Sequence, residues 1–171
     1  MPNWCQNTLV VTGVNKELTR FKIAAQADQI HEDTFSKEKT RYQSALSFQE
    51  LLPMPVELVH TTSPSKKPNK ALIKKYGADN WYDWHNNNWG CKWDIDATLL
   101  NETKRLEYQF DSPWSPPVEG ITAVSKLFPK LTFTLEFAEP GMGFAGRAVC
   151  KNGKLTEVGL PLEEVTDDMS Y

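Results

Sequence analysis

The stretch LTFTLEF, residues 131–137, alternates apolar and polar side chains without a break. Successive side chains of a β-strand point to opposite faces of a sheet, so this pattern predicts a strand with one buried face. The buried face is expected to hold Leu131, Phe133, Leu135 and Phe137, and the other face Thr132, Thr134 and Glu136.

The residues before this strand predict a hairpin and then a helix. DIDATLL (94–100) and RLEYQF (105–110) alternate in the same way and are separated by four residues, which is typical of two antiparallel strands joined by a turn. Apolar side chains then recur at helical spacing before Pro129, at Ile121, Val124 and Phe128, and Ser115 is the expected helix cap.

The two ends of the chain complete the pattern. NTLVVTG (7–13) predicts a first strand, and Asn15 is expected to cap a helix that ends near residue 27. Near the C-terminus, residues 143–151 and 154–160 flank Asn152-Gly153, a pair that suits a type I′ hairpin turn. The order predicts an α+β, ferredoxin-like β-α-β-β-α-β antiparallel sheet with an inserted helical segment and a C-terminal β-hairpin.

The length of 171 residues predicts a single domain over residues 1–171, with an insertion at about 28–93 and an acidic tail at about 161–171. Residues 28–43 show no period and are expected to form a loop. Further helices are expected between Asn69 and Gly77 and over about 79–88. The tail is expected to be a solvated end, since it carries Glu163, Glu164, Asp167 and Asp168.

The overall composition excludes several classes of protein. A net charge of −3 argues against non-specific nucleic-acid binding, which needs an excess of Lys and Arg. Cys5, Cys91 and Cys150 are odd in number and far apart, which favours a reducing cytoplasm over a disulfide framework. Neither a membrane-spanning run nor a signal peptide is evident, so a cytoplasmic location and no membrane partner are expected.

Five motifs follow one another along the chain: MPNWCQNTLVVTG, LLPMP, DWHNNNWGCKWD, FDSPWSPP and FAEPGMGFAG. Together they resemble the phage- and plasmid-borne family called YubB or Api-type ferredoxin-like proteins. The resemblance spans residues 1 to about 146, apart from 28–43, and implies a ferredoxin-like fold and a mobile-element origin but no activity. The family pattern reads NWGTKW, so Cys91 stands here in the place of Thr, and a role that needs a hydroxyl group there is in doubt.

WYDWHNNNWGCKWD (81–94) holds four of the six tryptophans. These rings form either a small satellite core, which the usual burial of Trp favours, or a stacking platform for a base, a sugar or a cation. We expect Trp4, Trp89 and Trp93 to be buried, and Trp81 or Trp84 to border a polar groove. The candidate ligand- or partner-binding residues are Asn3, Trp81, Trp84, His85 and Asn88.

Catalytic, cofactor and metal signals are weak. Pro2 would expose a secondary amine if Met1 were removed, which permits a tautomerase-like general base. GMGFAG (141–146) matches a dinucleotide-binding pattern, but a strand is expected after it where that site requires a helix. The candidate metal ligands Cys5, His60, His85, Cys91 and Cys150 lack the spacing of a zinc site. Neither a cofactor nor a metal is therefore expected.

The leading hypothesis is a non-enzymatic binding module of a mobile genetic element that acts on a host or phage macromolecule, with a protein as the expected partner. One alternative is a tautomerase-like enzyme that uses the amine of Pro2. The other is a nucleic-acid-binding ferredoxin-like sheet, since such sheets can stack bases. This alternative has little support, because GMGFAG carries one aromatic residue, Phe144.

Overall fold

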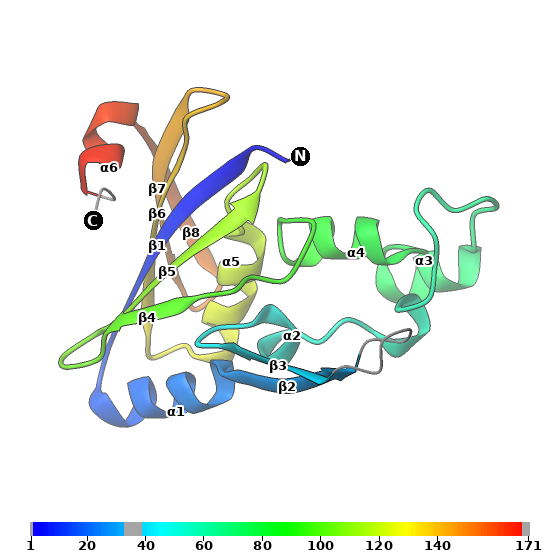
Figure 1. Ribbon diagram of the computed structural model, residues 1–171, viewed down its shortest axis with the longest axis horizontal. Coiled ribbons are helices and arrows are strands. Elements are labelled where there is room, and N and C mark those ends of the chain that lie inside the picture. Colours follow the sequence, from blue (N-terminus) through cyan, green and yellow to red (C-terminus); the bar gives the residue numbers. More distant parts are fainter. Residues whose placement is uncertain (1, 33–38, 169–171) are drawn as a thin grey trace.

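The computed structural model describes residues 2–32 and 39–168. Within them, the main sheet is antiparallel and six-stranded, in the order β4-β5-β1-β6-β7-β8 (Figure 1). Its strands are β1 (Trp4–Thr12), β4 (Thr98–Asn101), β5 (Leu106–Pro113), β6 (Thr132–Glu139), β7 (Phe144–Lys151) and β8 (Lys154–Leu160). With α1 (Asn15–Ala25) and α5 (Val118–Leu127), the first four give the ferredoxin-like order, and the predicted fold is confirmed.

The core lies between this sheet and the two helices. The alternation of residues 131–137 is confirmed, since Leu131, Phe133 and Leu135 are fully buried. Phe21 of α1 meets the rings of Phe128 and Phe133 edge-on, at centroid distances of 5.1 and 5.3 Å. Such aromatic packing adds specificity to the burial of apolar area, which dominates the stability of the sandwich.

Turns and helix ends were predicted unevenly. The hairpin of β7 and β8 is confirmed, with positive φ at Asn152 (49°) and Gly153 (74°). The predicted caps of the two sandwich helices are wrong: Asn15 is already helical, and Val14 precedes it without a side-chain cap. Ser115 does not cap α5, because Pro117 occupies that position and the Ser115 hydroxyl donates instead to the Gly90 carbonyl at 2.7 Å.

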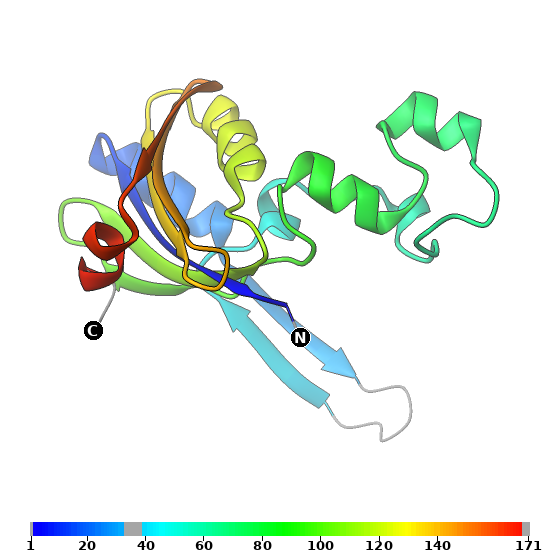
Figure 2. The ribbon, with the colours of Figure 1, turned by 90° about the horizontal axis from the view of Figure 1, so that it is seen from above.

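An inserted segment, residues 27–97, projects from the sandwich between α1 and β4 (Figures 1 and 2). Its elements are β2 (Ala27–Glu32), β3 (Lys39–Ser44), α2 (Phe48–Leu51), the 3-10 helix η1 (Val56–Leu58), α3 (Lys70–Tyr76) and α4 (Trp81–Asn88). The expected loop over 28–43 is wrong for 28–32 and 39–43, which pair as an antiparallel ribbon. The remainder of that stretch, 33–38, lies outside the described residues.

The two helices predicted inside the insertion are confirmed. Asn69 caps α3 by accepting from the backbone N–H groups of Ala71 and Leu72, and Gly77 ends the helix in the left-handed conformation. α4 is capped by the side chain of Asn80, and Gly90 follows its end with a φ of 81°.

The acidic tail is more structured than expected. Residues Leu162–Asp168 form α6, and Val165 is buried against Ala138 of β6 and Ala145 of β7. The acidic side chains around Val165 suggested a solvated end, but Val165 itself packs on the sheet. Among the described helices, none is long and apolar enough to span a membrane.

Candidate partner-binding site

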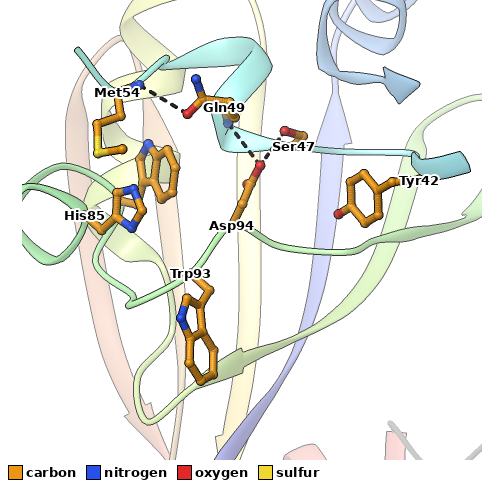
Figure 3. Close-up of a pocket in the computed structure, with 8 residues that line it drawn as sticks. Tyr42, Ser47, Gln49, Met54, His85, Trp93 and Asp94 are labelled. Atoms are coloured by element: carbon orange, nitrogen blue, oxygen red, sulfur yellow. Dashed lines mark hydrogen bonds between the residues drawn. The ribbon is translucent and has the colours of Figure 1, made fainter. Parts of the chain in front are cut away.

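A pocket of about 310 Å³ opens between elements of the inserted segment (Figure 3). Side chains reach it from β3, from α2, from α4 and from the link between α4 and β4. The lining residues are Tyr42, Ser47, Gln49, Met54, His85, Trp89, Trp93 and Asp94. Most of the exposed wall is apolar, so the few polar atoms in it decide what it can bind.

Asp94 has a structural role in this pocket. Its carboxylate accepts hydrogen bonds from the Ser47 hydroxyl at 2.6 Å, the Phe48 amide at 2.6 Å and the Gln49 amide at 3.2 Å. The two amides belong to the first turn of α2, whose N–H groups have no partner within the helix. Asp94 therefore fixes α2 against the link to β4 and is not a free base.

His85 leaves one ring nitrogen unsatisfied. Its Nδ1 lies 2.8 Å from the carbonyl oxygen of Lys92, which can only accept, so Nδ1 carries the proton. Burial lowers the pKa of His85, which keeps the ring neutral and makes Nε2 an acceptor. Nε2 is buried and has no partner among the described residues. An unmade hydrogen bond of this kind costs on the order of 1–3 kcal/mol.

The tryptophans of α4 and its C-terminus are mainly structural. Trp89 is 2% exposed, so its predicted burial is confirmed. Its Nε1 donates to the Leu52 carbonyl, and its ring stacks on that of His85 with 3.9 Å between the ring centroids. Trp84 is also buried, so it cannot border a groove. Trp81 is half-buried and meets the His85 ring edge-on at 5.5 Å. Trp84 and Trp89 are therefore core residues, but they belong to the main core and not to a separate satellite core.

Three other tryptophans are exposed. Trp4, Trp93 and Trp114 are 47%, 40% and 45% accessible, so the expected burial of Trp4 and Trp93 is wrong. The Trp93 ring centroid lies 6.3 Å from that of Trp4 and 6.5 Å from that of Trp114. The Lys92 ammonium sits 4.5 Å from the Trp93 centroid and 5.3 Å from the Trp114 centroid. We call these four residues the tryptophan surface.

Both wrong burial expectations have a physical reason. Trp4 has the opposite parity to the buried Cys5 and Leu9 on β1, so its side chain points away from the core. The junction after α4 is anchored by Trp89 and by the hydrogen bonds of Asp94, which leaves Trp93 free to face outward. Trp93 therefore belongs both to the pocket wall and to the tryptophan surface.

Trp114 is held in a strained backbone conformation. Its φ is 65°, and the Ser115 amide donates to the Pro113 carbonyl at 2.9 Å, which closes a γ-turn around Trp114. A bulky residue in this region is an outlier that persists only when its surroundings enforce it. One constraint is the Trp114 amide, which donates to the Asn3 carbonyl at 2.8 Å.

A buried relay of hydrogen bonds supplies the rest of the constraint. Asn7 donates through Nδ2 to the Ser112 hydroxyl at 2.9 Å, and that hydroxyl donates to the Ser115 carbonyl at 2.7 Å. Ser115 in turn donates to Gly90 at the end of α4. The relay ties the Trp114 turn to β1 and to the inserted segment. Trp114 was not predicted as a site residue, although the prolines that flank it in FDSPWSPP indicated a constrained turn.

The cysteines and the candidate metal ligands do not converge. Cys5, Cys91 and Cys150 are free and buried. Burial raises the pKa of Cys91 to about 12, and its thiol donates to the Trp93 carbonyl at 3.2 Å. The thiol thus makes a hydrogen bond of the kind that a Thr hydroxyl could make there. Among the described residues, no group of three or more His, Cys, Asp or Glu could hold a metal ion.

The remaining candidate residues are dispersed. Pro2 is partly exposed, precedes β1 by two residues and is not among the residues that line the pocket. Asn3 is exposed and contributes its carbonyl to the Trp114 turn. Asn88 donates through its side chain to the Trp84 carbonyl within α4. Of the five candidate binding residues, the structure brings His85 into the pocket.

A family model supports the ferredoxin-like fold of the C-terminal part of the chain. Residues 88–169 match the family model described as the ferredoxin-like domain in Api92-like protein. That range runs from the end of α4 through β4, β5, α5 and the C-terminal strands to α6. No match to a curated protein was found. A similar solved structure is the crystal structure of a protein api92 from Yersinia pseudotuberculosis, 13% identical, with a TM-score of 0.48 over 94% of this chain and 99% of that chain.

Proposed function

We propose that this chain is a non-enzymatic binding module that docks a protein partner on the tryptophan surface. The observation that carries the proposal is the clustering of Trp4, Trp93 and Trp114, which come from separate parts of the chain and are each at least 40% exposed. Exposed aromatic clusters mark interaction sites, and Trp is enriched among the residues that dominate binding energy.

The spacing of the rings favours a ligand that lies across them. Inserting a flat base between two rings needs about 7 Å between parallel planes, that is, two contacts of about 3.5 Å. Here the rings are tilted by 40° and 31°, with centroids only 6.3 and 6.5 Å apart. The apolar side chains of an extended peptide can cover such a surface without entering it.

The charges nearby also favour protein over nucleic acid. Lys92 is the one cation of the tryptophan surface, and it makes no ion pair with the described residues. On the same face of β1 as Trp4, Gln6 lines a groove with Asp96 and Asp111, whose carboxylates would repel phosphates. One unpaired ammonium can instead receive a single carboxylate of a peptide.

The biological setting is part of this proposal. The resemblance of the sequence motifs supports an origin on a phage or plasmid, with the whole chain as an Api92-like protein. The free, buried thiols of Cys5, Cys91 and Cys150 support action in a reducing cytoplasm of the host. Genes of phage or plasmid replication and transfer are expected beside this one, and a consistently chromosomal housekeeping neighbourhood would contradict that origin.

Site-specific photocrosslinking tests the docking surface. A photoreactive phenylalanine at position 114 should crosslink a protein from host or phage-infected lysate, whereas the same residue at the exposed Met142 should not. Competition decides specificity: excess unlabelled chain should abolish the crosslink, and excess Trp4→Ala/Trp114→Ala chain should not. Equal competition by both chains, or a crosslinked nucleic acid in place of a protein, would overturn the proposal.

A further inference from the structure

We propose that the pocket beside the tryptophan surface binds a tyrosine side chain of the partner, whose phenol O–H donates to His85 Nε2. The identity of the partner rests on the proposed function above, but the chemistry of the pocket does not. It follows from the buried polar atom of the wall that has no hydrogen-bond partner.

The pocket wall has a free hydrogen-bond acceptor and therefore favours a ligand with a hydrogen-bond donor. The Asp94 carboxylate is saturated by α2, and the Ser47 hydroxyl both donates to Asp94 and accepts from the Glu50 amide. The Tyr42 hydroxyl donates to the Ile95 carbonyl at 3.2 Å. Among the side chains that line the pocket, His85 Nε2 is the buried atom without a partner. Because the proton is on Nδ1, a ligand must bring an O–H or N–H group to it.

The other side chains of the pocket wall favour a flat, apolar ligand group. Tyr42, Met54 and Trp93 line the pocket with His85 and come from different parts of the inserted segment (Figure 3). Nε2 has almost no exposed surface in the empty pocket, so a ligand must displace a neighbouring side chain to reach it. Met54 is the most adaptable side chain of the wall, since it is unbranched and rotates about three bonds.

These conditions together select tyrosine. An aliphatic hydroxyl would satisfy Nε2 but would leave the aromatic walls uncovered, and phenylalanine would cover the walls but leave Nε2 unsatisfied. A phenol carries its O–H at the far end of the long axis of the ring, which suits an acceptor deep in a pocket. An indole carries its N–H on the side of the ring. Trp93 is shared by both sites, so a tyrosine in the pocket would be continuous with a peptide across the tryptophan surface.

Small probes test this chemistry on the full chain by ligand-observed NMR. We expect 4-methylphenol to bind about three- to tenfold more tightly than toluene, the gain expected for one added hydrogen bond. We also expect 4-methylphenol to bind more tightly than 3-methylindole. Equal binding of 4-methylphenol and toluene would overturn the proposal, and tighter binding of 3-methylindole would reassign the pocket to tryptophan.

Two variants separate the hydrogen bond from the shape of the pocket. In His85→Asn the amide nitrogen can replace Nδ1 as the donor to the Lys92 carbonyl, but no atom replaces Nε2. The preference for 4-methylphenol over toluene should disappear in this variant, and a preference that persists would overturn the proposal. Met54→Ala shortens the most adaptable side chain of the wall and should increase the preference. An unchanged or smaller preference contradicts the proposal, even if His85→Asn fails to fold.

The two proposals fail separately. Trp114 belongs to the tryptophan surface but does not line the pocket, so Trp114→Ala should lose the partner and keep the preference for 4-methylphenol. A chain that discriminates the probes but crosslinks no protein would contradict the proposed function alone. A chain that crosslinks a partner but binds 4-methylphenol and toluene equally would contradict the tyrosine pocket alone.

Discussion

The sandwich and the inserted segment share one apolar core but differ in the regularity of their structure. In the sandwich, β1 is paired along its length with β5 on one side and β6 on the other, and apolar side chains fill one face. The inserted segment extends the same apolar core through Phe48 and Trp89. It is also joined to the sandwich by hydrogen bonds from the Ser115 hydroxyl to the Gly90 carbonyl and from the Gly120 amide to the Trp89 carbonyl. The tryptophan surface lies at this boundary, and the pocket lies beside it within the inserted segment.

The sharpest way to break the attachment is Trp89→Ala. Trp89 is nearly fully buried, stacks on Phe48 and His85, and donates to the Leu52 carbonyl. We expect the variant to lose about 3–5 kcal/mol of unfolding free energy, as buried aromatic truncations do. Urea denaturation measures the loss.

The matched control for this variant is Trp93→Ala, four residues away. Trp93 is 40% exposed, so its removal should cost about 1 kcal/mol or less. Equal losses in the two variants would mean that the tryptophan surface is part of the core.

A smaller effect is expected from Asp94→Asn. The amide can accept some of the hydrogen bonds that the carboxylate accepts, but it has no charge to offer the α2 terminus. We expect a loss of about 2 kcal/mol, with α2 more accessible to hydrogen exchange than β1. The exposed Asp96, two residues along the chain, is the control, and Asp96→Asn should change stability by less than about 0.5 kcal/mol.

The sandwich could be predicted because its periodicity is visible in the sequence. Leu131 to Phe137 has one buried face, and every second residue reports it. The β2–β3 ribbon shows no such period in its sequence, and its two strands are paired by backbone hydrogen bonds. Residue propensities and hydrophobic patterns do not report backbone pairing of this kind, so the ribbon could not be predicted from them.

The candidate site was predicted in part for the same reason. His85 stood out because it lies among aromatic residues, but its unsatisfied Nε2 depends on Lys92, seven positions away, turning its carbonyl back onto Nδ1. Trp4 and Trp114 meet Trp93 only through the sheet and the γ-turn, contacts that no local window contains. The parity of Trp4 with respect to Leu9 was, however, available from the sequence and predicted its exposure.

Acid should lower the unfolding free energy of the chain through the protonation of His85. Burial lowers the pKa of His85 in the folded chain below that of the unfolded chain, against smaller opposing effects from the Lys92 carbonyl and from Asp94. The unfolded chain therefore binds a proton first as the pH falls, so stability present above about pH 6.5 is lost toward the lowered folded-state pKa. Thermal melts at pH 7.5 and 5.5 should show a smaller drop in Tm for His85→Asn than for the unmodified chain. An identical drop would contradict the assignment to His85.

The smallest predicted effect tests whether the tryptophan surface is maintained at a cost to stability. Trp114 has a φ of 65°, a conformation that costs an L-residue about 1 kcal/mol and costs glycine almost nothing. Trp114→Gly should therefore be more stable than Trp114→Ala by about 1 kcal/mol, because alanine keeps the strain and glycine removes it. In an ordinary exposed loop, the glycine variant is instead the less stable of the two, since glycine gains more entropy on unfolding.

Both variants should lose the partner equally, because both lose the ring. A glycine variant that is more stable yet does not bind would mean that the γ-turn is retained for docking. An alanine variant that is at least as stable would mean that the turn is not strained in solution, and the relay from Asn7 to Gly90 would then need another explanation.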